Sequence, residues 1–274
     1  MASSYLSSQF ESNFLLKPSS VRPKKHLGQH FLKDQNIAEK IVNALSEQAL
    51  GGKVLEVGPG TGVLTQYLIA KEIDFLAFDV DEESVAFLKA QYPSHDQKFL
   101  LKDFLREPVE EKGVSVIGNF PYNISSQLFF KIYDDRSSVS EVVCMIQKEV
   151  AQRLVASHGN KVYGILSVLM QAFFDLEYLF TVPPGVFNPP PKVDSAVISL
   201  RRNSVDRLKC DEKLFKRVVK EGFGKRRKTL RNALKNLNLP SSLTSDSVFD
   251  KRAEQLSVKD FISLTKRIEP LWKP

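Results

Sequence analysis

The chain has 274 residues, with 39 Lys and Arg against 32 Asp and Glu and a formal net charge of +7. This length is near the upper limit for one hydrophobic core and predicts one large domain and one small one. The longest apolar stretch, 163–174, contains Ser167 and Gln171 and falls short of the roughly 20 residues that span a bilayer, so no membrane span is expected. Cys144 and Cys210 belong to no Cys or His cluster, which predicts no metal site and a cytoplasmic location.

The positive charge is concentrated in the last quarter of the chain. Residues 201–274 contain 20 Lys and Arg against 9 Asp and Glu, whereas residues 1–200 contain 19 against 23. This division predicts that the C-terminal part holds a polyanion while the rest does something less dependent on charge. The alternative is a basic helical domain whose charges are simply solvated. The Ser-rich start, residues 1–24, lacks the features of a secretory signal and is predicted to be a flexible tail.

After this tail, helical and strand patterns alternate along the chain. A helix is expected over 36–48, and strand-length apolar runs follow at 53–57, 75–79, 98–101, 114–118 and 141–146. Alternating β and α segments predict a parallel sheet in an α/β domain. Two further runs, 172–179 and 195–200, are expected to close the sheet as an antiparallel hairpin. Beyond Arg202 the chain becomes helical and basic, so the predicted domains are 25–200 and 201–274.

A glycine loop, Gly58-Pro59-Gly60-Thr61-Gly62, follows the first strand. Backbone without side chains can approach a ligand closely there. Asp79 ends the next strand, about 20 residues later, where a carboxylate can bind two ribose hydroxyls. A dinucleotide-binding loop shares this logic, but Val63 stands where that loop requires its third glycine. The spacing therefore favours a ligand without a pyrophosphate.

Asp103 follows the third strand, where a carboxylate can accept a hydrogen bond from an adenine amine while the neighbouring Phe104 covers the ring. Each of these residues also has an ordinary explanation. The glycines suit a tight turn, Asp79 can cap a helix, and Asp103 can be a loop acid. All three explanations would have to hold at consecutive strand ends, so the pattern favours an adenosine pocket formed by Gly58, Asp79 and Asp103.

The tetrapeptide Asn119-Phe120-Pro121-Tyr122 follows the fourth apolar run, at the edge of the sheet where open α/β folds bind ligands. The Asn119 side-chain oxygen and the Pro121 carbonyl can accept hydrogen bonds from an exocyclic amine, and Tyr122 offers a face on which a purine stacks. The alternative is an ordinary turn, for which Pro and Asn are both preferred residues. The tetrapeptide alone does not separate these two interpretations.

These motifs together resemble the class I S-adenosylmethionine-dependent methyltransferases and, within them, the ribosomal RNA adenine N6-dimethyltransferases. The resemblance begins at Gly28-Gln29-His30-Phe31-Leu32, includes the motifs above, and continues through 187–195, 225–234 and 252–257. The later segments are similar to the small-subunit (16S) members and not to the large-subunit erythromycin-resistance dimethylases. The resemblance implies a Rossmann-like fold with a mainly parallel seven-stranded sheet, helices on both faces, and a small C-terminal all-α domain.

The resemblance also implies a methyl donor, S-adenosyl-L-methionine, and no metal. The implied cofactor contacts are His30, Leu32, Gly58, Asp79, Asp103 and Asn119. Two of these depart from a common family pattern, because His30 stands where many members have Asn and Asp79 where many have Glu. Both replacements keep a hydrogen-bonding group but change its reach.

The expected catalytic residues are Asn119, Pro121 and Tyr122. Two acceptors on the amine would orient its lone pair toward the methyl group, so position replaces a strong base. The target base must be extruded from its neighbours, and aromatic faces offset the cost of unstacking. Tyr122 is the first choice of stacking platform. Phe187, on a Pro-rich loop, is the second, with a hydrophobic plug beneath that loop as the alternative.

The predicted RNA contacts are Lys225, Arg226, Arg227, Lys228 and Arg231. A helix over 225–235 would place Arg227, Arg231 and Lys235 on one face and leucines on another, so that one face packs while the other meets phosphate. Arg22, Lys24 and Lys25 are expected to extend the track. Such contacts supply affinity with little sequence information, so RNA shape would select the adenines.

The expected activity is dimethylation of two adjacent adenines in the hairpin near the 3′ end of 16S rRNA, within an immature 30S subunit, by a monomer. The resemblance carries this specificity. One alternative is a ribosome-assembly factor that binds RNA and for which catalysis is secondary. Another keeps the chemistry and moves it to large-subunit rRNA.

Overall fold

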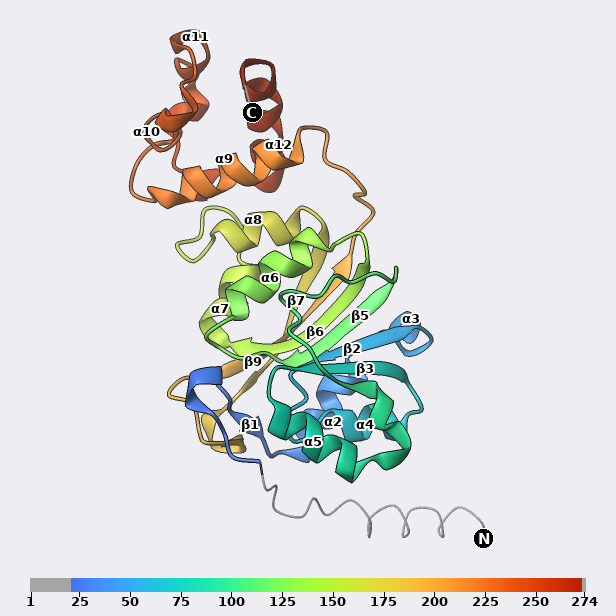
Figure 1. Ribbon diagram of the computed structural model, residues 1–274. Coiled ribbons are helices and arrows are strands. Elements are labelled where there is room, and N and C mark those ends of the chain that lie inside the picture. Colours follow the sequence, from blue (N-terminus) through green and yellow to red (C-terminus); the bar gives the residue numbers. More distant parts are fainter. Residues whose placement is uncertain (1–20, 273–274) are drawn as a thin grey trace.

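The computed structural model describes residues 21–272, and its centre is a seven-stranded sheet in the order β4-β3-β2-β5-β6-β9-β7 (Figure 1). Strands β2 to β6 pair in parallel, and β9 runs antiparallel between β6 and β7. The predicted parallel sheet and closing antiparallel hairpin are therefore confirmed. The strands of this sheet are β2 Lys53–Val57, β3 Asp74–Asp79, β4 Phe99–Leu101, β5 Val114–Asn119, β6 Val139–Gln147, β7 Phe174–Val182 and β9 Ser195–Arg202.

The central strands are apolar on both faces because helices cover both sides of the sheet. In β6, Val142 and Cys144 belong to one hydrophobic cluster, whereas Val143 and Met145 belong to the other. Helices α2, α4 and α5 pack on one face and α6, α7 and α8 on the opposite face (Figure 1). The helices of these two layers are α2 Gln35–Asn43, α3 Glu47–Leu50, α4 Thr65–Ala70, α5 Glu82–Gln91, α6 Ser125–Asp134, α7 Lys148–Val155 and α8 Ile165–Gln171.

The single helix predicted over 36–48 is wrong, because the structure has two helices there. Asp34 caps α2 by accepting a hydrogen bond from the Ile37 backbone N–H at 3.0 Å. Ser46 caps α3, and its hydroxyl also donates to Glu141 of β6 at 2.8 Å. This long-range contact fixes the break between the helices, and a helical period cannot reveal it.

The C-terminal part consists of α9 Glu212–Gly224, α10 Leu230–Ala233, α11 Ser241–Thr244 and α12 Val258–Ile268. These helices lie beyond α8 (Figure 1) and share one continuous hydrophobic cluster with that side of the sheet. Arg136 strengthens the junction, because its guanidinium lies over the rings of Tyr133 and Phe173 and pairs with Glu212 at the start of α9. The division at residues 200 and 201 stays a prediction, since the packing is continuous across it.

The predicted flexible tail lies mostly outside the described residues, which begin at Val21. Within its last four residues, Val21 is buried and Lys24 is paired with Asp81. Beyond them, β1 Phe31–Leu32 pairs antiparallel with β8 Phe187–Asn188 in a separate two-stranded sheet. The boundary between residues 24 and 25 stays a prediction.

Candidate active site

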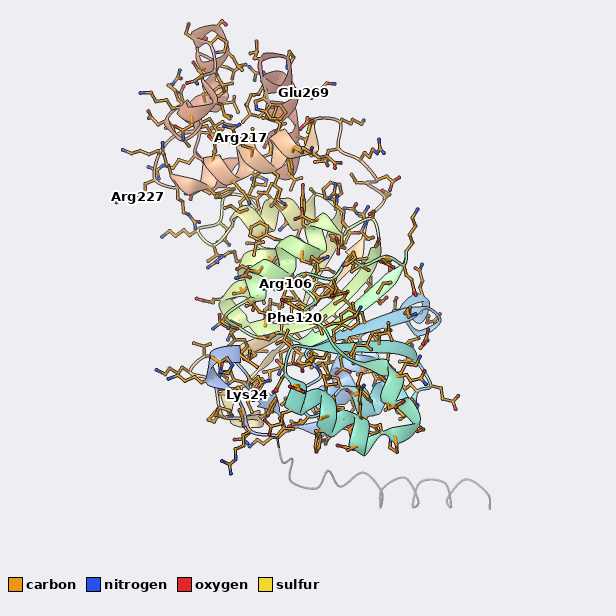
Figure 2. The ribbon with its side chains drawn as sticks, viewed as in Figure 1. Lys24, Arg106, Phe120, Arg217, Arg227 and Glu269 are labelled. Carbon is orange, nitrogen blue, oxygen red and sulfur yellow. The ribbon has the colours of Figure 1, made fainter. Side chains whose placement is uncertain are left out.

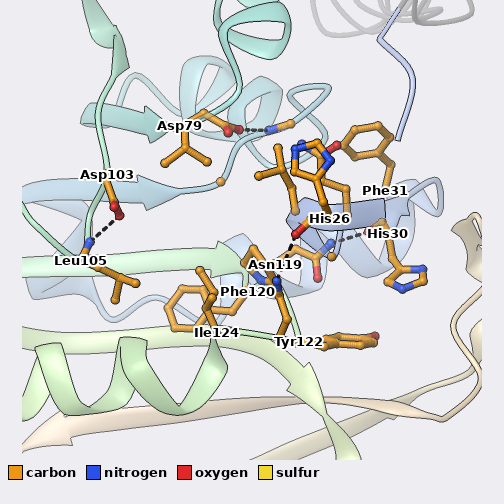
Figure 3. Close-up of a pocket in the computed structure, with 18 residues that line it drawn as sticks. His26, His30, Phe31, Asp79, Asp103, Leu105, Asn119, Phe120, Tyr122 and Ile124 are labelled. Carbon is orange, nitrogen blue, oxygen red and sulfur yellow. Dashed lines mark hydrogen bonds between the residues drawn. The ribbon is translucent and has the colours of Figure 1, made fainter. Parts of the chain in front are cut away.

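A cavity lies at the carboxyl ends of β2, β3 and β5, beside the loop after β4 (Figure 3). The chain adds β3 and β4 on one side of β2 and returns to add β5 on the other, so this is the topological switch point. The predicted site residues found in its lining are His30, Gly58, Asp79, Asp103, Asn119, Pro121 and Tyr122. Leu32 is not among them, because its side chain is buried in the hydrophobic cluster beneath β1 and its neighbour Phe31 faces the cavity.

The glycine loop lets the backbone come close to the cavity. Gly58 and Gly60 have φ angles of 71° and 55°, which favour glycine. A Cβ added to Gly60 would lie 2.9 Å from the Phe31 ring, whereas one on Gly58 would meet nothing within 4 Å. Gly60 is thus required for packing, and Gly58 leaves open space in front of its Cα.

Asp79 is held in place by the backbone around it. Its two carboxylate oxygens accept hydrogen bonds from the backbone N–H of Gly60 at 3.2 Å and of Asp81 at 2.9 Å. Burial raises the pKa of Asp79 above its ordinary value, and these N–H groups oppose that rise. Each carboxylate oxygen has two acceptor positions, so capacity remains for two hydroxyl donors from the cavity.

The wall of the cavity that contains Asp103 also has apolar side chains. Asp103 accepts a hydrogen bond from the Leu105 backbone N–H at 3.0 Å, which fixes its carboxylate at the cavity edge. The predicted ring cover, Phe104, is wrong: it is 3% exposed and belongs to the core. Val80, 52% exposed, lines the cavity together with Leu105 and Ile124. Val80 was not among the site residues predicted from the sequence. Its position offered a signal, because an apolar residue that directly follows Asp79 at the end of β3 can line the same cavity.

Asn119 points its amide into the junction between β5 and the N-terminal segment. Its Nδ2 donates a hydrogen bond to the His30 carbonyl at 2.8 Å (Figure 3). Within residues 21–272 no hydrogen-bond donor reaches its Oδ1. The bond to His30 therefore fixes the orientation of the amide and leaves the oxygen as a directed acceptor.

The second predicted acceptor, the Pro121 carbonyl, is already used inside the loop. It accepts hydrogen bonds from the Ser125 hydroxyl at 3.0 Å and from the Ile124 backbone N–H at 3.3 Å. A carbonyl oxygen has two lone pairs, so both are engaged. The neighbouring Phe120 carbonyl receives no hydrogen bond from the described part of the chain, and Phe120 lines the cavity. Among the described residues, the unpaired backbone acceptor beside Asn119 is therefore the Phe120 carbonyl and not that of Pro121.

The two candidate stacking residues differ in accessibility. Tyr122 lines the cavity, its hydroxyl is hydrogen-bonded to the Ser195 hydroxyl, and its ring stacks on His30. Phe187 is 1% exposed and packs in the core beneath the Pro-rich loop. Its predicted stacking role is therefore wrong, and the alternative of a hydrophobic plug is correct, because β1 pairs with β8 and covers the ring.

The N-terminal segment covers one side of the cavity and is fastened to the loop after β3. Lys24 pairs with Asp81 and Glu83, and the Gln29 amide donates to Asp81 at 3.0 Å. Burial opposes ionisation of Asp81, but hydrogen bonds from Gln29, Lys24 and Ser84 outweigh it and hold its pKa below the ordinary value. The Lys24 side chain therefore holds the N-terminal segment in place through these ion pairs and is not a free cation of the predicted RNA track.

Glu56 lies behind the glycine loop and is fully buried. It accepts a hydrogen bond from the Thr65 hydroxyl at 2.7 Å. Burial raises the pKa of Glu56 to about 8; the Asp79 charge adds to this rise, and the Thr65 hydrogen bond opposes it. The carboxyl is therefore mostly protonated in the folded protein at neutral pH.

Because the folded protein keeps this carboxyl protonated, Glu56 should lower the free energy of unfolding as the pH rises. Glu56→Gln should remove this effect. Below the ordinary pKa of 4.5 the group is protonated in both folded and unfolded chains. Between 4.5 and about 8 the unfolded chain releases a proton that the folded chain keeps, so the free energy of unfolding falls by up to about 1.4 kcal/mol per pH unit. In urea unfolding, the advantage of the Gln variant should grow from pH 5 to pH 8. A constant difference across this range would show that the pKa is not raised.

The basic segment 225–228 is a turn, so the predicted helix over 225–235 is wrong. Helix α9 ends at Gly224, and α10 begins at Leu230. Arg226 donates to the carbonyls of Lys161 and Tyr163 and pairs with Glu254. Arg231 donates to the Thr244 carbonyl and pairs with Asp250. Both arginines are exposed but have partners within the protein. Within residues 21–272 no hydrogen bond or ion pair engages the exposed side chains of Lys225, Arg227 and Lys228.

No group of three or more His, Cys, Asp or Glu side chains within residues 21–272 is placed to hold a metal ion. No helix in the same range is long and apolar enough to cross a membrane.

Comparison with known proteins identifies similar chains. Residues 21–269 match the model of a family described as ribosomal RNA adenine dimethylase. Curated relatives named ribosomal RNA small subunit methyltransferase A include that of Cytophaga hutchinsonii, 52% identical over 252 residues, which are 90% of this chain and 98% of the relative. Another is that of Bacteroides thetaiotaomicron, 52% identical over 258 residues, which are 92% of this chain and 96% of the relative.

Two solved structures share the fold over most of the chain. A dimethyladenosine transferase from Plasmodium falciparum superimposes with a TM-score of 0.74 at 24% identity, covering 88% of this chain and 98% of that one. The 23S rRNA methyltransferase ErmE superimposes with a TM-score of 0.65 at 22% identity, covering 86% and 99%. The likeness supports a Rossmann-like methyltransferase fold with a helical C-terminal part.

Proposed function

Because the chain belongs to the ribosomal RNA adenine dimethylase family, we propose that it dimethylates N6 of two adjacent adenines in the hairpin near the 3′ end of 16S rRNA. The methyl donor is S-adenosylmethionine. The observation that carries this proposal is the meeting of the adenosine-type cavity with the free Asn119 Oδ1 at one end of the sheet. The choice of small-subunit RNA rests on the names of relatives that the chain matches over nearly their whole length.

The cavity residues fit an adenosine ligand. Asp79 has acceptor capacity for two ribose hydroxyls, and Asp103 stands where it can accept from an adenine amine. The exposed side chains of Val80, Leu105 and Ile124 offer an apolar surface to a planar ring. Open space in front of Gly58 lets the backbone approach the ligand. S-adenosylmethionine supplies an activated methyl group on a sulfonium, which is a good leaving group.

Asn119 Oδ1 and the Phe120 carbonyl are the proposed acceptors for the two N–H groups of the target amine. Adenine N6 is a weak nucleophile because its lone pair is delocalised into the ring. Two acceptors held by the strand end favour a more tetrahedral nitrogen and orient its lone pair. After one methylation a single N–H remains, so the second transfer keeps one of the two hydrogen bonds. Tyr122 is the proposed stacking platform for the base.

The cationic turn, Lys225, Arg227 and Lys228, is the proposed phosphate contact. Figure 2 shows Arg227 at the outer edge of the C-terminal helices. Arg226 is not free for this role because it fastens the turn to the loop before α8. Because Arg226 holds the turn in place, the neighbouring cationic side chains lose less conformational entropy when they bind RNA. Affinity from such contacts depends on salt.

Replacing Arg227 and Lys228 together with Ala should weaken binding to the RNA about tenfold and lower the slope of log affinity against log salt by about 2. The control is the pair Lys259→Ala and Lys266→Ala in α12, which removes the same charge from the same part of the chain. Filter binding over a range of salt concentrations measures both. An equal effect of the two pairs would mean that net charge, and not the turn, sets the affinity.

The proposed substrate particle is an immature 30S subunit in the cytoplasm. The two cysteines of the chain are both free thiols, which suits a reducing compartment. One chain carries the cavity, the amine acceptors and the cationic turn, which supports action as a monomer.

The test is to incubate the protein with 30S subunits that lack the modification, or with 50S subunits, and labelled S-adenosylmethionine. Label confined to 16S rRNA is expected. Label in large-subunit RNA alone would move the chemistry to that substrate. Binding to 30S subunits without any transfer would favour an assembly factor over an enzyme.

A further inference from the structure

His30 and Tyr122 form a stacked pair between the cofactor cavity and a second groove. Their ring centroids are 5.3 Å apart and their planes are inclined by 26°. Both residues line the cavity, and both also line a groove whose opposite wall is Pro189-Pro190-Pro191, here called the proline groove. Figure 3 shows the rings of both residues on the same side of the cavity as Asn119.

Tyr122 is the fixed member of the pair. Its hydroxyl is hydrogen-bonded to the hydroxyl of Ser195, which is fully buried at the start of β9. Its backbone lies in the turn into α6, where the Ser125 hydroxyl donates to the Tyr122 carbonyl at 3.3 Å. Moving this ring would break a buried hydrogen bond, which is costly.

His30 is the movable member. Its imidazole Nδ1 is 2.7 Å from the exposed Pro189 carbonyl, and because a carbonyl only accepts, Nδ1 must carry the hydrogen. Its backbone is held separately, through the hydrogen bond from the Asn119 amide to the His30 carbonyl. The imidazole can therefore change rotamer while the contact to Asn119 is kept.

The imidazole covers one face of Tyr122, and no third ring fits between two rings in direct stacking contact. We propose that His30 is a placeholder: its imidazole occupies the Tyr122 face that the target adenine uses, and it turns away from that face when the base enters. This inference rests on the proposed function and adds to it a residue that controls access of the base. The protein binds the base in the fraction of molecules whose His30 is turned away, which raises the apparent KM for RNA.

Two variants separate the ring from its hydrogen bond. His30→Asn keeps a side-chain donor for the Pro189 carbonyl but has no aromatic face, so it should lower KM for unmodified 30S subunits about tenfold. His30→Phe keeps the ring and loses the donor, so its KM should lie between those of His30→Asn and wild type. The Kd for S-adenosylhomocysteine, measured by calorimetry on each variant, separates an effect on the cofactor from one on the base.

A KM for 30S subunits that is unchanged or raised in His30→Asn would overturn the proposal, because the imidazole would then not stand in the way of the base. A weakened cofactor Kd without a lower subunit KM would also overturn it and make His30 a cofactor contact. If the wild-type protein transfers no label to either subunit, the proposed function is wrong, and the placeholder role of His30 is wrong as well. If the wild-type protein is active and the variants have the same KM for 30S subunits, only the placeholder role is refuted.

A spectroscopic measurement tests the stacking directly. In protein labelled with 13C at histidine, the His30 ring protons should be shifted upfield by the Tyr122 ring current. Tyr122→Leu should return them to the positions of an exposed histidine. A His30 resonance that is the same in wild type and Tyr122→Leu would contradict the stacked pair.

Discussion

Asn119→Ala is expected to reduce methyl transfer by about a hundredfold to a thousandfold while leaving binding to 30S subunits unchanged. The substitution removes an oriented acceptor from the amine, and losing one such electrostatic contact in a transition state typically costs a factor of 10² to 10³ in rate. It also leaves the His30 carbonyl without its donor at 2.8 Å, which loosens the N-terminal segment over the cavity. Single-turnover transfer from labelled S-adenosylmethionine measures the effect.

The matched control for this prediction is Asn123→Ala. Asn123 also lines the cavity and also donates to a carbonyl of the N-terminal segment, that of His26 at 3.5 Å, but it is exposed and its hydrogen bond is long. Its replacement should change the transfer rate by no more than about threefold. Equal losses in the two variants would show that the N-terminal contact, and not the acceptor on the amine, is what Asn119 supplies.

Asp79→Ala should weaken the affinity for S-adenosylhomocysteine about a hundredfold. Two hydrogen bonds from ribose hydroxyls to a carboxylate are together worth roughly 3 kcal/mol, which corresponds to about that factor. Calorimetry needs no catalysis and so reports the cofactor site alone. Asp79→Asn keeps one acceptor oxygen and is expected to fall between wild type and the Ala variant.

Asp79 also accepts from the Gly60 and Asp81 backbones, so its loss leaves two donors without a partner. The Ala variant should therefore be less stable as well, and its affinity must be measured below its unfolding transition. Asp96→Ala, an exposed acid outside the cavity, is the control for charge. Wild-type affinity in a folded Asp79→Ala variant would remove Asp79 from the cofactor site.

The sheet was predictable because each strand is short, apolar and bounded by turn residues. The predicted run 53–57 coincides with β2. The others differ from their strands by a few residues, with the largest difference at β7. Patterns of period two and 3.6 report burial, and burial is what a sheet covered on both faces imposes. The break between α2 and α3 was not predictable in this way, because Glu141 of β6 fixes it from 95 residues away.

The candidate site was predictable in residue type but not in detail. Gly58, Asp79, Asp103 and Asn119 follow strands whose carboxyl ends meet in one cavity, as their order predicts. Which carbonyl is free was not predictable, because the Ser125 hydroxyl folds back onto Pro121. The burial of Phe187 was likewise hidden, since it results from pairing between β1 and β8.

The cationic segment shows the same limit. Charge density predicted a polyanion contact, but charge does not reveal which arginines have internal partners. Arg226 and Arg231 find acids and carbonyls in segments 13 to 65 residues away along the chain. Local pattern reports composition and period, whereas these contacts depend on how the C-terminal helices pack.

The most direct test of the central claim is to count modified nucleosides in 16S rRNA after the reaction. Unmodified 30S subunits are incubated with the wild-type protein and S-adenosylmethionine, the 16S rRNA is digested, and the nucleosides are quantified by mass spectrometry. Two N6,N6-dimethyladenosines per 16S rRNA, at adjacent positions near the 3′ end, are expected. Recovery of unmodified adenosine alone, or of methyl groups on another atom, would contradict the account.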